Sequence, residues 1–188
     1  MLSYASVFLA ASLTIGQADQ QNQTDDFKKL RGFLGTWEAK YDEAEGEVGD
    51  VLASWKLILE GKFIEHRYVF KPGAGNEEFR GLALFGRDPV DGKVHGWGFD
   101  NQGGVMAMEL TGWDGMKSKW STTFSNADGT TGKSEANEFE LRDKNSYRWM
   151  LAIAGGDKSE AVFKRVRSKK MEWPDQQYDT PNGLAEPL

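Results

Sequence analysis

The sequence predicts an all-β fold, namely an up-and-down antiparallel β-barrel of about ten strands with one short N-terminal helix. From Gly35 onward, apolar and polar residues alternate with a period of two, and turn residues recur about every dozen positions. The chain also holds 7 Trp, 11 Phe and 22 Gly but 5 Pro, a composition typical of short strands joined by tight turns. Ten consecutive strands without a crossover favour closure, because closure removes unpaired edges.

The predicted helix covers about residues 25–34. Thr24 can cap it, Asp25 and Asp26 suit its positive N-terminus, and Phe27, Leu30, Phe33 and Leu34 fall on one face. Gly32 and Gly35 then end it. The predicted strands follow in order at residues 36–42, 51–59, 63–71, 78–86, 94–100, 105–113, 116–124, 133–141, 146–154 and 159–167. Between the fourth and fifth strands, Asp88-Pro89 and Asp91-Gly92 supply the turn chemistry of a hairpin.

The 188 residues fit one domain with flanking segments. Residues 1–18 resemble a signal peptide, with an apolar stretch and small residues that suit cleavage after Ala18. This predicts a periplasmic or secreted bacterial protein; the alternative is a short helix packed on the domain. The expected divisions are the signal peptide at 1–18, a polar linker at 19–24, the barrel at 25–167 and a loosely ordered tail at 168–188, which Trp173 and Tyr178 could pin to the barrel.

Charge and composition exclude several classes of function. With 23 basic and 29 acidic residues the net charge is −6, and no long basic run is present, so neither nucleic acid nor an anionic membrane surface is an expected partner. The absence of cysteine excludes disulfides, thiolate catalysis and Cys-ligated metals. No phosphate loop, dinucleotide fingerprint or nucleophile elbow is found, and no cofactor is predicted.

Alternation of side chains predicts an interior with aromatic walls and few polar groups. We expect His66 and Tyr68 to point inward from one strand, and His95, Trp97 and Phe99 from another. Trp120, Asn137 and Trp149 are expected to face the same space. A largely apolar pocket with a few convergent polar groups is the usual composition of a ligand site. The candidate binding residues are therefore Tyr68, Trp97, Phe99, Trp120, Asn137 and Trp149, with His66 and His95 as candidate catalytic or ligand-orienting groups.

The two histidines allow two interpretations. Each is a core histidine bonded to a neighbouring Tyr or carbonyl, or the two form a pair that acts as general base or ligand anchor near neutral pH. A zinc site would need a carboxylate as well, and alternation places Glu65 and Asp100 on the faces opposite His66 and His95. No metal site is therefore predicted.

The stretch FLGTWEA, with Gly35-Thr36-Trp37 at the start of the first strand, resembles the Gly-x-Trp signature of the lipocalin and fatty-acid-binding (calycin) group. That resemblance implies that Trp37 closes one barrel end against a basic residue of the last strand, here Arg165 or Arg167. The blocks KLRGFLGTW, LILEGKFIEHRYVF, FRGLALFGRDPVDGKVHGWGFDNQGG and YRWMLAIAGGDKSEAVFKRVR are similar to the bacterial domain-of-unknown-function 1579 family over residues 26–167. That family implies a lipocalin-like barrel without an established biochemical role. The haem-binding nitrobindins share the Gly-x-Trp start, but no His follows His95 to serve as their axial ligand.

Three functions fit these observations. The first is an exported barrel that binds a small, mostly apolar or aromatic molecule and does not insert into membranes after signal removal. The second is an enzyme, such as an isomerase, cyclase or hydrolase, that uses the histidine pair in the cavity. The third is a structural or interaction protein with a solid barrel and a contact-bearing tail. We favour ligand binding because of the inward aromatic row.

Overall fold

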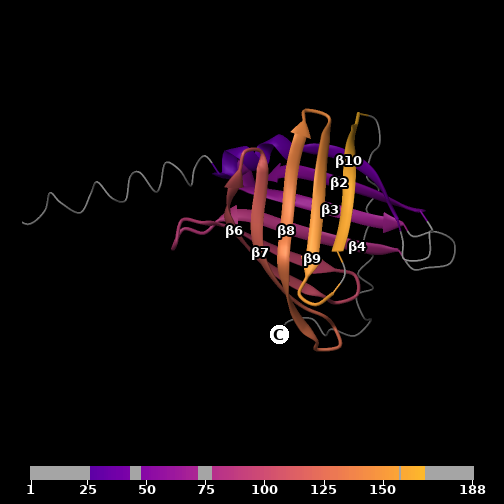
Figure 1. The fold of residues 1–188 in the computed structure, drawn as a ribbon. Helices are drawn as coiled ribbons and strands as arrows, with labels where there is room; N and C mark the ends of the chain where they lie inside the picture. Colours follow the sequence, from indigo (N-terminus) through magenta and orange to yellow (C-terminus); the bar gives the residue numbers. More distant parts are fainter. Residues whose placement is uncertain (1–25, 43–47, 72–77, 157, 168–188) are drawn as a thin grey trace, which may run out of the picture.

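The computed structural model describes residues 26–42, 48–71, 78–156 and 158–167 (Figure 1). The predicted signal peptide, the linker, and the tail with Trp173 and Tyr178 lie outside the described residues. Within the described part of the chain, no helix is long and apolar enough to cross a membrane.

The fold is a closed antiparallel barrel of ten strands, which confirms the predicted class. The strands are β1 (Gly35–Asp42), β2 (Val48–Ile58), β3 (Phe63–Lys71), β4 (Phe79–Arg87), β5 (Val94–Asp100), β6 (Val105–Asp114), β7 (Lys117–Ser125), β8 (Thr131–Asp143), β9 (Ser146–Ile153) and β10 (Lys158–Val166). Each strand pairs with its neighbours in the sequence, so the topology is up-and-down throughout. In Figure 1, β7–β10 run steeply across the near wall while β2–β4 cross behind them, as tilted strands of a barrel do.

Pairing between the first and last strands closes the barrel. Thr36 lies opposite Val166, and Trp37 lies opposite Arg165. On its other edge β1 pairs with β2 along its full length, so residues 36–38 of β1 have partners on both sides. Closure therefore removes the unpaired edges that an open sheet of ten strands would leave.

A short helix covers one end of the barrel. Residues 26–30 are α-helical and continue as the single 3₁₀ turn η1 (Arg31–Phe33), which agrees with the predicted short helix. A second 3₁₀ turn, η2 (Leu59–Gly61), joins β2 to β3 at the same end, where the Arg31 side chain donates to the Gly61 carbonyl. Leu30 and Phe33 are fully buried, because they cover the apolar interior that the strands surround.

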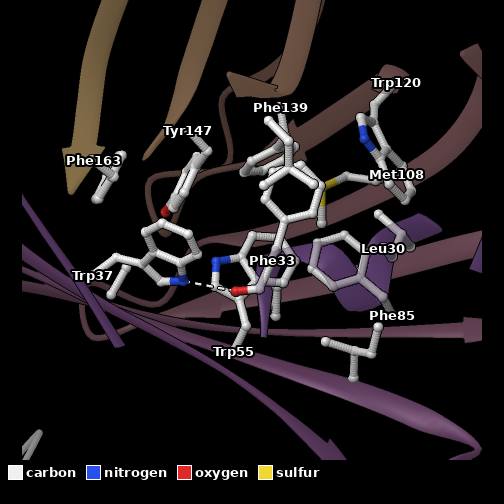
Figure 2. Close-up of a cluster of buried hydrophobic side chains, with 14 of the residues drawn as sticks. Leu30, Phe33, Trp37, Trp55, Phe85, Met108, Trp120, Phe139, Tyr147 and Phe163 are labelled. Atoms are coloured by element: carbon white, nitrogen blue, oxygen red, sulfur yellow. Dashed lines mark hydrogen bonds between the residues drawn. The ribbon is translucent and has the colours of Figure 1, made fainter. Parts of the chain in front are cut away.

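Phe33 is the centre of this covered end (Figure 2). Its ring lies 5.3 Å from the Trp55 ring and 5.4 Å from the Tyr147 ring, measured between centroids. The indole Nε1 of Trp37 donates to the Phe33 carbonyl oxygen at 2.6 Å. That bond satisfies a buried donor and fixes the helix on the barrel. We refer to this end as the closed end.

The turn between β4 and β5 is stabilised by its own side chains. A carboxylate oxygen of Asp88 accepts the amide of Val90 at 2.7 Å, and one of Asp91 accepts the amide of Lys93 at 2.8 Å. Gly92 has a φ of 71°, a left-handed conformation that glycine adopts without steric cost. The Asp-Pro and Asp-Gly pairs therefore act as turn residues, as the sequence indicates.

Candidate ligand-binding site

The barrel encloses a cavity of about 390 Å³ between the closed end and the opposite end. Its walls are mainly aromatic and sulfur-containing side chains from six strands. The lining residues are His66, Tyr68, Phe70, Phe79, Ala83, Phe85, Met106, Met108, Asn137, Phe139, Tyr147, Trp149, Leu151, Ser159 and Phe163. None of these described lining residues is an aspartate, glutamate, lysine or arginine. The cavity is therefore apolar, with its polar chemistry confined to a few side chains.

His66 is one of these polar groups and points inward from β3, as alternation predicts. Its imidazole stacks on the Trp55 indole with centroids 4.0 Å apart and planes 18° apart. The side chain is 7 % exposed, and burial lowers its pKa from the usual 6.5 to about 3. His66 is therefore neutral at physiological pH, because the charged form would lose its hydration. Its Nε2 atom is buried and has no hydrogen-bond partner.

Asn137 is the second polar group and points inward from β8. Its amide nitrogen donates to the Thr122 hydroxyl at 2.9 Å and lies 3.8 Å from the Met108 sulfur. These contacts fix the amide plane, and its oxygen Oδ1 is left buried without a partner. Buried polar atoms in folded proteins nearly always have partners, so this unpaired acceptor on a cavity-lining residue is an exception.

The remaining walls are rings packed edge against face. Tyr68 lies across Gly81, its partner on β4, where a Cβ atom would come 2.0 Å from the Tyr68 ring. Burial, together with the negative charge of Asp100, raises the Tyr68 pKa and keeps the phenol neutral. Trp149 faces the same space from β9, with its ring 6.3 Å from Phe70. Of the predicted binding residues, Tyr68, Asn137 and Trp149 thus line one cavity together with His66.

The predicted inward direction of His95, Trp97 and Phe99 was wrong. These residues do share one face of β5, but it is the outer face, and Trp97 and Phe99 are 39 % and 46 % exposed. The inner face carries Gly96 and Gly98. Gly96 lies opposite Phe85 of β4, and a Cβ atom there would come 2.8 Å from the Phe85 ring and 2.9 Å from the Met108 methyl group. Side chains from the neighbouring strands β4 and β6 already fill the interior at this point, so the inward-facing residues of β5 there are glycines.

The two histidines consequently lie on opposite sides of the barrel wall and cannot act on one ligand. His95 is held at the β4–β5 turn, where its Nε2 lies 2.9 Å from a carboxylate oxygen of Asp91. Asp88, Asp91 and His95 each offer one potential metal-ligand atom, and these atoms lie within 4.8 Å of one another. Both carboxylates already accept backbone amides of the turn, and this cluster is separate from the cavity.

Trp120 is buried but is not a lining residue. Its Nε1 donates to the Ser118 hydroxyl at 2.9 Å, and its ring packs 5.1 Å from Phe85. It therefore packs in the core beside the lining residue Phe85.

Several lining residues were absent from the sequence-based candidates, among them Phe79, Ala83, Phe85 and Phe139. Their signal is present in the sequence: Phe79, Ala83 and Phe85 alternate on one face of β4, and Phe139 follows Asn137 on β8.

At the closed end, the structure places Arg165 over Trp37. The guanidinium carbon of Arg165 lies 3.9 Å from the centre of the indole ring. Arg167, the other candidate from the Gly-x-Trp resemblance, is exposed. Neither Trp37 nor Arg165 lines the cavity, but Trp37 packs against the lining residue Tyr147 with ring centroids 4.8 Å apart.

No family model matches the chain, and no curated protein matches it. The solved structures that match include a de novo designed fluorescence-activating β-barrel, at 14 % sequence identity and a TM-score of 0.41. That match covers 72 % of this chain and 95 % of the designed chain. The barrel class of the present chain is assigned from its own strand pairing. Membership of the domain-of-unknown-function 1579 family stays a prediction.

Proposed function

We propose that this barrel binds a small, mostly apolar or aromatic molecule in its interior. The observation that supports the proposal is the combination of an apolar cavity of about 390 Å³ with two buried polar atoms, on His66 and Asn137, that have no partners. Ligand pockets commonly measure about 300–1,000 Å³ and pair apolar walls with a few oriented polar groups. The cavity of this protein has that size and that chemistry.

The two rival functions have less support. An enzyme that uses a histidine pair needs both imidazoles in one space, and His95 lies on the outer surface. A barrel with a purely structural role would be filled by side chains, since small barrels usually fill their interior. The unfilled volume beside Tyr68, Phe139 and Trp149 instead favours binding.

The proposal includes export. Residues 1–18 have the pattern of a signal peptide, and export would place the barrel in the periplasm or outside the cell. N-terminal sequencing of the protein secreted by a bacterial host tests this part. We expect the mature chain to begin at Asp19, whereas an intact Met1 on protein recovered from the cytoplasm would contradict export.

Native mass spectrometry beside a denatured spectrum tests the binding function. We expect extra mass on the native protein that disappears on denaturation and whose value gives the chemical class of the ligand. A second measurement covers the case in which the ligand is lost during purification. N-phenyl-1-naphthylamine is an uncharged apolar dye whose fluorescence rises in dry sites, and we expect it to bind in a ratio of about one per chain. A native spectrum without extra mass, together with no dye binding, would contradict the proposal.

A further inference from the structure

We infer that the cavity selects uncharged aromatic compounds bearing a hydroxyl or N–H group, and that it discriminates against carboxylates such as fatty-acid anions. This inference rests on the proposed binding function and adds the chemical class of the ligand. Three features of the cavity carry it: the two unpaired polar atoms, the absence of charge among the described lining residues, and the flat rings of the walls.

The unpaired atoms define what the ligand must offer. Asn137 Oδ1 is an acceptor, so it calls for a donor on the ligand. Neutral His66 presents Nε2, which donates or accepts according to its tautomer. A hydroxyl group donates and accepts at once and therefore suits either atom. Leaving buried polar atoms unpaired is costly, so a ligand that satisfies them gains affinity over a purely apolar one of the same shape.

The charge of the lining defines what the ligand must lack. An anion taken from water into an apolar space needs a cation beside it, and the described lining residues include no lysine or arginine. His66 cannot supply the charge, because its burial against Trp55 keeps it neutral. Tyr68 and Tyr147 remain protonated phenols for the same reason, since burial raises the pKa of both. A carboxylate would therefore enter this cavity at a large loss of hydration.

The shape of the walls favours a flat ligand. Rings approach the space from β3, β4, β8 and β9, and Tyr68, Phe79 and Trp149 are among them. Tyr68 and Phe79 lie 6.0 Å apart at an interplanar angle of 32°. Aromatic ligands gain contact area and favourable edge-to-face or offset geometry on such walls.

Three probes with the same bicyclic ring system separate these features: 2-naphthol, naphthalene and 2-naphthoate. The affinity of each is measured by displacement of N-phenyl-1-naphthylamine at neutral pH. We expect 2-naphthol to bind roughly 10-fold more tightly than naphthalene, in line with one or two buried hydrogen bonds. We expect 2-naphthoate to bind more weakly than either, because its carboxylate finds no cation.

Variants connect the preference to its residues. His66→Phe keeps a ring against Trp55 but removes Nε2, and Asn137→Leu removes Oδ1. We expect each variant to lose most of the 2-naphthol preference, measured as the ratio of the 2-naphthol and naphthalene affinities within that variant. His95→Phe is the matched control, because the same exchange on the outer surface leaves the cavity unchanged. Circular dichroism and thermal unfolding identify any variant that fails to fold. If His66→Phe or Asn137→Leu does not fold, the other of these two variants tests the inference.

The possible outcomes distinguish a failure of this inference from a failure of the proposed binding function. Equal affinity for 2-naphthol and naphthalene, or a preference retained in both His66→Phe and Asn137→Leu, would overturn the role of the polar atoms. Tighter binding of 2-naphthoate would overturn the selection against charge. Dye that binds but is displaced by none of the three probes would overturn the proposed ligand class. In all of these cases the binding function survives, whereas absence of dye binding contradicts the function itself.

Discussion

The guanidinium group of Arg165, near the end of β10, lies over the indole of Trp37 on β1, with its central carbon 3.9 Å from the ring centre. The same side chain donates through Nε to the Lys144 carbonyl at 2.8 Å and through Nη2 to the Gly32 carbonyl at 3.3 Å. It also donates to the Leu34 carbonyl. One arginine thus joins the helix, the first strand and the β8–β9 turn at the closed end.

Replacing that arginine is expected to destabilise the barrel. Arg165→Met keeps a flexible apolar stem but removes the cation over Trp37 and three donors to backbone carbonyls. We expect the free energy of unfolding to fall by about 2–3 kcal/mol, since hydrogen bonds from charged donors and the cation–π contact are both lost. Urea denaturation followed by tryptophan fluorescence measures the change.

Arg167→Met is the control for this experiment, because Arg167 is exposed and follows directly after the end of β10. We expect its effect to stay within about 0.5 kcal/mol, as is usual for surface substitutions. A similar loss in both variants would show that net charge, not the contact with Trp37, determines the effect.

A pH-dependent stability follows from the burial of His66. Its pKa is about 3 in the folded protein against 6.5 in the unfolded chain, so the unfolded state binds more protons between these values. The stability contribution is nearly complete at about pH 7.5 and is lost as the pH falls through 6.5 toward 3. Between about pH 7.5 and 5.5 the expected loss is about 1.4 kcal/mol.

Urea denaturation of the unmodified protein and of His66→Phe at both pH values tests this expectation. The phenyl ring cannot take up a proton, so the variant should lose less stability than the unmodified protein over this window. The acidic groups with lowered pKa, such as Glu160 at about 2, act at lower pH and in both proteins. Parallel pH profiles for the two proteins would contradict a neutral, buried His66.

Much of the fold could be predicted from the sequence, because alternation and turn chemistry are local signals. The predicted strand at residues 63–71 coincides with β3, and that at 94–100 coincides with β5. The direction of a strand's faces is a different matter. In β5 the larger side chains, Trp97 and Phe99, point outward because Phe85 and Met108 occupy the interior from neighbouring strands. Which face is inward depends on that non-local packing, which no pattern within β5 records.

The inward glycines of β5 provide a test of this explanation. Gly96→Ala places a methyl group against the Phe85 ring and the Met108 side chain at distances below 3.0 Å. We expect the free energy of unfolding to fall by about 1–3 kcal/mol, which is the usual effect of overpacking a core. Gly156→Ala, in the β9–β10 turn, adds the same methyl at ordinary contact distance from Ile153 and should change stability by less than about 0.5 kcal/mol. Equal effects at both sites would contradict tight packing beneath Gly96.

The candidate site was also predictable only in part, because alternation along a strand is local whereas packing across the barrel is not. His66, Tyr68, Asn137 and Trp149 follow from alternation, because their strands have one clearly more apolar face. The unfilled volume between them does not follow, since it depends on how the side chains of opposite walls meet across the barrel. The unpaired state of Asn137 Oδ1 is also set by a distant residue, Thr122, which holds the amide nitrogen.

A pair of alanines on opposite faces of the barrel wall tests whether binding occurs in the cavity. Ala83 on β4 is 2 % exposed and lines the cavity opposite His66, whereas Ala107 on β6 faces outward beside Trp97. Ala83→Leu adds three carbons to the binding space. We expect it to weaken the binding of N-phenyl-1-naphthylamine at least about 10-fold, because the added atoms overlap the space that the dye would occupy. Ala107→Leu adds the same atoms outside the wall and should leave the affinity unchanged. If Ala107→Leu weakened or strengthened dye binding while Ala83→Leu had no effect, the dye would bind the exposed patch around Trp97 and Phe99, and the interior site would be wrong.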